Sequence, residues 1–138
     1  MALELSKAIY SRLTGYSALT NLVGTRIAPM EARNTWKLPY VTYQIVSDPP
    51  THAMIQDATI YNPLVQVDIW AETYSNVKSI AKQVETRLKD YGGTITVSST
   101  SLIIQRIFYE GQSEMKEIDM ETNEVTFRIM QEYRIWHD

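Results

Sequence analysis

The sequence predicts an α+β fold, a mainly antiparallel sheet of about four strands with helices packed on one face. Its 138 residues fit a single domain, because domains usually run to ~100–150 residues. Three segments carry apolar residues at helical spacing, and four others are rich in β-branched and aromatic residues. Their order (helix, helix, strand, strand, helix, strand, strand) contains no internal repeat and no linker, so residues 1–138 form one domain.

Helical spacing is present near the N-terminus and in the middle of the chain. One helix is expected to end at Gly15, and a short second helix at residues 17–23 to end at Gly24. The strongest pattern covers residues 73–90, with Thr73 as its N-cap. The residues expected to face inward are Leu5, Ala8, Ile9 and Leu13 in the first helix, and Val77, Ile80, Ala81, Val84 and Leu88 in the last.

Four strands are predicted at residues 40–47, 63–71, 101–109 and 123–136. The first two alternate apolar and polar residues. Residues 101–109 are apolar on both sides, so this strand is expected to be central in the sheet or covered on both faces. In the last strand one face is apolar, and the other is expected to meet solvent or a partner. Residues 25–39 are predicted as a loop with a brief extended stretch at 26–28.

Two connections are long for a compact domain, residues 48–62 and residues 111–123. The second has four acidic residues and one lysine, so its charge of −3 equals the net charge of the whole chain. Apolar residues are interspersed with the acidic ones. We therefore expect residues 111–123 to form a β-hairpin arm that docks on another subunit, with a mobile surface loop as the alternative. The expected partner contacts are Glu114, Met115, Glu117, Ile118, Asp119 and Met120 in this arm, and Arg128 and Arg134 on the last strand.

Composition argues against several kinds of chemistry. The absence of Cys excludes disulfides, thiol catalysis and thiolate metal sites, and the net charge of −3 does not favour binding to phosphate backbones. His52 and His137 are expected to be solvated bystanders. The acidic residues near 110–121 lack the spacing of a calcium loop, and no nucleotide-binding or nucleophile motif occurs. The expectation is a protein with no catalytic residues, no cofactor and no metal, without a signal peptide or membrane span.

Several short segments together resemble the tail-completion, or tail terminator, family of long-tailed bacteriophages and prophages. They are Ala18-Leu19 with Leu22-Val23-Gly24 and Arg26-Ile27, Leu38-Pro39-Tyr40-Val41 with Tyr43-Gln44, and Val67-Asp68-Ile69-Trp70-Ala71 with Tyr74. The resemblance covers nearly the whole chain in the correct order. The arm at 111–123 is the part that we cannot match to the family pattern.

The resemblance implies an α+β subunit of a hexameric ring on the head-proximal end of a phage tail tube. Such a ring stops tube polymerisation and joins the tube to the head connector. The implied partners are further copies of the chain, the major tail tube protein and the head-tail connector or stopper protein. The implied location is the head–tail junction of the virion, after assembly in the host cytoplasm. DNA would only pass through the lumen, with weak duplex binding at ~100–150 mM salt.

Two alternatives stay open. One is a head-side completion or stopper protein of similar size, and the other is a small ligand-binding α+β module. An enzyme is the least favoured class, because no set of acid and base residues converges in the sequence.

Overall fold

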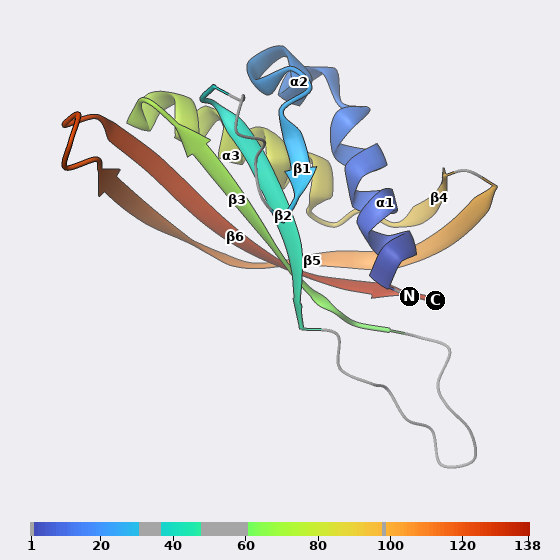
Figure 1. Cartoon of the computed structure of the whole chain (residues 1–138). Coiled ribbons are helices and arrows are strands. Elements are labelled where there is room, and N and C mark those ends of the chain that lie inside the picture. The colour runs from blue at the N-terminus through green and yellow to red at the C-terminus, as the bar shows by residue number, and fades with distance from the viewer. Residues whose placement is uncertain (1, 31–36, 48–60, 98) are drawn as a thin grey trace.

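The computed structural model describes residues 2–30, 37–47, 61–97 and 99–138, with side chains from Leu5 onward. Three helices and six strands lie in this part of the chain (Figure 1). In order they are α1 (Ala2–Thr14), α2 (Ser17–Val23), β1 (Ile27–Pro29), β2 (Tyr40–Ser47), β3 (Leu64–Ala71), α3 (Tyr74–Leu88), β4 (Gly93–Val97), β5 (Thr100–Ile118) and β6 (Val125–His137).

The strands form one sheet in the order β1-β2-β3-β6-β5-β4. The β1–β2 pair is parallel, and the other four pairs are antiparallel. The α+β class and the mainly antiparallel sheet are therefore confirmed, but the predicted count of four strands is wrong. The two additional strands are the shortest, at three and five residues, and Ile95 and Val97 of β4 do alternate with threonines.

The sheet curls into a half-barrel around the helices, as Figure 1 shows. Helix α1 contacts both β1 and β4, which are the two edge strands of the sheet. A flat layer could not bring both of its edges to one helix. The prediction of a four-stranded layer with helices on one face is corrected on this point, because strand twist and bulges bend the sheet.

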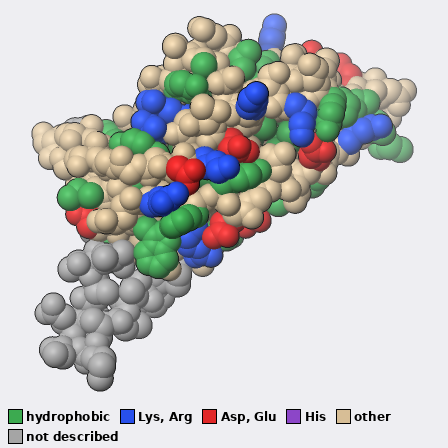
Figure 2. All heavy atoms as spheres, turned by 180° about the vertical axis from the view of Figure 1, so that it is seen from behind, with side chains coloured by type: hydrophobic (Ala, Val, Ile, Leu, Met, Phe, Trp, Pro, Cys, Tyr) green, Lys and Arg blue, Asp and Glu red, His purple; other side chains and the backbone are tan. Residues whose placement is uncertain are grey.

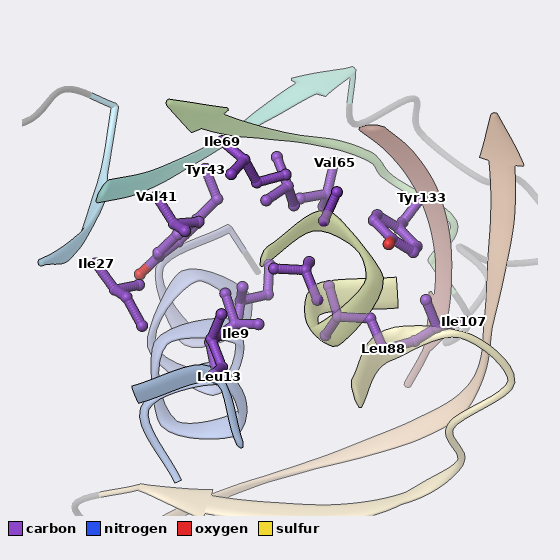
Figure 3. Close-up of a cluster of buried hydrophobic side chains, with 14 of the residues drawn as sticks. Ile9, Leu13, Ile27, Val41, Tyr43, Val65, Ile69, Leu88, Ile107 and Tyr133 are labelled. Carbon is purple, nitrogen blue, oxygen red and sulfur yellow. The ribbon is translucent and has the colours of Figure 1, made fainter. Parts of the chain in front are cut away.

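The hydrophobic core fills the space between the concave face and the helices (Figure 3). All of the predicted inward-facing residues of the first and last helices are buried. Thr73 caps α3 as predicted, because its side chain accepts a hydrogen bond from the backbone N–H of Asn76 at 3.1 Å. The helical patterns were strong enough to identify both helix faces correctly.

Strand β6 lies in the middle of the sheet and has the predicted alternation. Ile129, Tyr133 and Ile135 are buried on the inward face. Gln131 lies in the same row and is fully buried. Its Nε2 donates to the carbonyl oxygen of Ala81 at 3.0 Å, and its Oε1 accepts from the Tyr133 hydroxyl at 2.9 Å. A buried amide is stable there because its polar atoms are hydrogen-bonded.

Strand β5 lies inside the sheet, between β6 and β4, but it is not covered on both faces. The first alternative of the prediction is confirmed and the second is wrong. Leu102, Ile104 and Ile107 are buried, whereas Ile103 and Phe108 are 44% and 43% exposed. The register of β5 against β6 shifts between Ile104 and Arg106 and again between Tyr109 and Gly111. Each irregularity changes which residues point inward. Apolar residues therefore occur at both alternating positions because the set of inward-pointing residues changes along the strand. They do not indicate that both faces of the strand are covered.

The two predicted loops are described only in part. The brief extended stretch at 26–28 corresponds to β1, which pairs with β2. Residues 31–36 and 48–60 lie outside the described residues, so neither the rest of the first loop nor the 48–62 connection is tested. No described helix is long and apolar enough to span a membrane.

Candidate functional site

Residues 111–123, which we call the arm, belong to a long β-hairpin. Strand β5 continues to Ile118 and pairs with β6 as far as Ile118–Val125. The Asp119 N–H donates to the Glu124 carbonyl at 2.8 Å, and the Asn123 N–H donates to the Asp119 carbonyl at 2.7 Å. The hypothesis of a β-hairpin arm is confirmed, while its docking on another subunit stays a prediction.

The arm is the most exposed part of the described sheet. All residues from 112 to 124 are exposed. Among its apolar side chains, Met115, Ile118 and Met120 are 37%, 52% and 88% exposed. Glu117 and Asp119 are exposed as well. An apolar and acidic surface on a projecting hairpin is suited to contact with another macromolecule and has no role in the core.

Glu114 fixes the base of the arm to α3. Its carboxylate accepts a hydrogen bond from Lys78 Nζ at 2.8 Å and one from the Tyr74 hydroxyl at 3.0 Å. The Lys78 hydrogen bond, followed by that from Tyr74, lowers the pKa of Glu114 below its ordinary value. The same contact raises the pKa of Lys78. Glu114 is thus held as an anion at neutral pH by α3, and its contact with a partner stays a prediction.

A small pocket of about 180 Å³ lies between the start of α3 and the arm. It is walled by aromatic, aliphatic and charged side chains from α3, β5 and β6. The Tyr74 ring packs edge-on against Phe127, with centroids 6.0 Å apart. The lining residues are Tyr74, Val77, Glu114, Met115, Lys116, Phe127, Arg128 and Ile129.

The two predicted arginines are both engaged within the chain. Arg128 donates two hydrogen bonds to Asp68 Oδ1 at 3.0 and 3.2 Å, and its guanidinium lies 4.7 Å from the Trp70 ring centroid. Arg134 pairs with Glu110 at 3.4 Å and donates to the carbonyl of Asn62 at 3.0 Å. Arg128 also pairs with Met115 of the arm in the β5–β6 ladder. Both arginines thus have partners within the chain, and their contact with another subunit stays a prediction.

His137 is buried, so the expectation of a solvated side chain is wrong. The residue is 1% exposed, and its ring stacks on Tyr61, with centroids 5.4 Å apart. The backbones of Tyr61 and His137 also exchange hydrogen bonds of 2.7 and 3.0 Å. The burial follows from pairing between segments 76 positions apart, which sequence patterns do not reveal. His52 lies outside the described residues.

Charged side chains are mixed over the described surface. Viewed from behind, basic and acidic side chains lie side by side across the centre of the molecule (Figure 2). Within the described ranges, no three His, Asp or Glu side chains gather as a metal site would require.

Sequence reasoning missed Tyr74 and Lys78 as the anchors of the arm. Their i, i+4 spacing at the start of α3 places both side chains on one face of the helix and was a usable signal.

Comparison with protein families gives a match over residues 7–138 to the family described as "Tail completion protein gp17". The chain belongs to this family. The resemblance in the sequence is thereby confirmed, and the match spans both the half-barrel and the arm. A search of curated proteins finds no match to the chain.

Solved structures share the fold at low sequence identity. A chain of the "Virion of native gene transfer agent (GTA) particle" has a TM-score of 0.71 and 16% identity, covering 96% of this chain and 93% of that one. A second solved chain, known only by a sequence identifier, has a TM-score of 0.53 and 14% identity, covering 98% and 96%. Both comparisons show that the curled sheet with its helices is a shared architecture.

Proposed function

We propose that this tail completion protein caps the head-proximal end of a phage tail tube as a ring of six subunits. The ring ends tube polymerisation by occupying the growing end, and its other side joins the tube to the head connector. Family membership supports a structural role in phage tail assembly. The likeness to a chain of a virion particle fits the same role.

The observation that carries the proposal is the exposed arm on a compact half-barrel. A closed ring of identical subunits requires two different contact patches on each copy, because every subunit meets its neighbours head to tail. The arm is one such patch, with three exposed apolar side chains among acidic ones. The half-barrel supplies the rigid body that the contacts position.

The proposed mechanism is steric and needs no catalytic step, cofactor or metal. The acidic balance of the chain suits a lumen through which DNA passes without being held, since like charges do not retain phosphates. We expect weak duplex binding at ~100–150 mM salt. The location that follows is the head–tail junction of the virion.

The test combines native mass spectrometry with electron microscopy of the protein and the purified tail tube protein. We expect six-fold rings at one end of each tube, and shorter tubes as the concentration of the protein rises. Binding to the connector without any effect on tubes would favour the head-side stopper. A dimer that binds a small molecule and ignores tubes would favour the ligand-binding module.

A further inference from the structure

We propose that the arm of one copy docks in the groove between α3 and β5 of a second copy, with its acidic tip against the lysines of α3. The inference rests on the proposed ring, because it assigns the two patches of the head-to-tail contact. It concerns residues 117–124, which we call the tip, and the outer face of α3.

The groove has a volume of about 350 Å³ and runs between α3 and the base of the arm. Its lining combines the small side chains of Ser79 and Ala81 with longer polar ones. Such a floor leaves room for an incoming side chain. The full lining is Lys78, Ser79, Ala81, Lys82, Glu85 and Gln112.

Two exposed lysines, Lys82 of α3 and Lys89 at its C-cap, lack ion-pair partners within the described part of the chain. Lys82 lines the groove, and Lys89 Nζ lies 6.0 Å from the Tyr109 ring of β5 at the far end of the same boundary. Neither forms a salt bridge with a described acidic residue, whereas Lys78 is held by Glu114. The groove's lining thus holds one lysine without a described ion pair, Lys82, beside one carboxylate, Glu85, and Lys89 adds a second such lysine outside the lining.

One wall of the groove is an open strand edge. Strand β4 pairs with β5 only as far as Ile104. After α3, the Asp90 N–H donates to the Ile107 carbonyl, and the Ile107 N–H donates to the Tyr91 carbonyl. From residue 108 to residue 118, no described strand pairs with β5 on this side. An open edge offers unpaired N–H and C=O groups to another chain.

The tip has the complementary chemistry. It holds Glu117, Asp119, Glu121 and Glu124 with no basic residue, and none of these carboxylates forms an ion pair with a described side chain. Met120, which is 88% exposed, lies between them. Methionine adapts to irregular contacts, so it is suited to the small-residue floor beside Ala81.

The tip cannot use the groove of its own chain. Along β5, Gln112 lies in the groove beside Lys82, and Glu114 pairs with Lys78 one turn nearer the start of α3. Increasing residue number on β5 therefore runs toward the first residues of α3. Ile118 lies four residues, about 13 Å, farther in that direction. The tip extends past the helix and away from Lys82 and Lys89, so the matching surface must come from another copy.

The test uses charge reversal in two matched variants of the full chain. One variant carries Glu117→Lys with Glu121→Lys in the tip, and the other carries Lys82→Glu on α3 with Lys89→Glu at its C-cap. Asp119 is left unchanged because its Oδ1 accepts from the Glu121 N–H within the turn. The control carries Lys7→Glu with Lys37→Glu, two exposed lysines outside the groove, and changes the net charge by the same amount as the variant with reversed lysines.

Each reversed variant alone is expected to self-associate about 10- to 100-fold more weakly than the wild type, because like charges then meet at every contact. An equal mixture of the two is expected to restore assembly as an alternating ring, since each variant's tip then meets a complementary groove. Native mass spectrometry measures both results. The control is expected to assemble like the wild type.

The contact is overturned if rings form normally in either reversed variant, if the mixture fails to rescue assembly, or if the control is equally impaired. A wild-type chain that stays monomeric at about 1 mM also overturns it as a self-contact. Capping of tubes is measured separately. Tubes that are capped by rings insensitive to these reversals would remove the inference and leave the proposed function in place.

Discussion

The two halves of the β5–β6 hairpin share one backbone ladder and differ in everything around it. Near Ile107 and Ile135, the paired strands form the middle of the sheet and their inward side chains are buried. Toward the turn, β5 from residue 112 to residue 118 carries exposed side chains and one anchored carboxylate, Glu114. Hydrogen bonding between strands is therefore compatible with both environments. Burial against the helices is what separates the part that stabilises the fold from the part available for contact.

The largest expected difference between the two halves is in the free energy of unfolding when an isoleucine in each is replaced by alanine. Ile135→Ala removes a side chain that is 1% exposed, and we expect the free energy of unfolding to fall by about 2–5 kcal/mol. Ile118→Ala, at 52% exposed, is expected to change it by no more than about 0.5 kcal/mol. Urea unfolding of both variants measures the contrast. Equal effects would show that the arm belongs to the cooperative core.

A smaller effect is expected from the buried polar pair on β6. Tyr133→Phe leaves the Oε1 atom of Gln131 without its hydrogen bond, at an expected cost of about 1–3 kcal/mol in unfolding free energy. The matched control is Tyr10→Phe, because that ring is 43% exposed. Thermal unfolding would compare them, and a cost for Tyr133→Phe no larger than the control's would contradict the role of the pair.

Alkaline pH should weaken the half-barrel through Tyr43. Burial raises the pKa of its hydroxyl from 10.0 to about 12. The folded state then holds the proton more tightly than the unfolded chain, so this contribution is complete below pH 10 and is lost as the pH rises toward 12. Tyr43→Phe is expected to reduce the slope of unfolding free energy against pH in that range. An unchanged slope would refute the assignment.

The smallest expected effect concerns how the arm is held. Glu114→Gln removes the charge that Lys78 and Tyr74 hold, so backbone amides of residues 112–118 should exchange hydrogen faster while the melting temperature stays nearly constant. Because the pKa of Glu114 is lowered, the wild-type anchor is present above the ordinary value of 4.5 and is lost as the pH falls below it. Glu117→Gln is the control, and equal exchange in both variants would contradict the anchor.

Sequence patterns predicted the helices well because each helix face is a local property. The stripe from Val77 to Leu88 is complete within α3, and its burial required no knowledge of the sheet. The same holds for the alternation in β6. For the arm, the clustering of acidic and apolar residues predicted a hairpin, and the structure contains one.

What the sequence could not predict depends on contacts between distant segments. In β5, the alternation of inward and outward residues changes where the register shifts against β6. The burial of His137 arises from its pairing with Tyr61. Arg128 and Arg134 were expected to meet partners because they alternate with apolar residues. Their engagement by Asp68 and Glu110 depends on which strands become neighbours.

The position of β6 in the sheet bears on the order in which the chain can fold. Although it follows every other strand in the sequence, β6 lies between β3 and β5. Strands β1 to β3 and strands β4 and β5 are thus two separate groups until residues 125–137 are synthesised. During translation the growing chain can form its helices and the first hairpins, but it cannot close the sheet. Subunits would consequently become competent for assembly only in one late step, and truncation within this central strand should leave two fragments of sheet with exposed apolar edges.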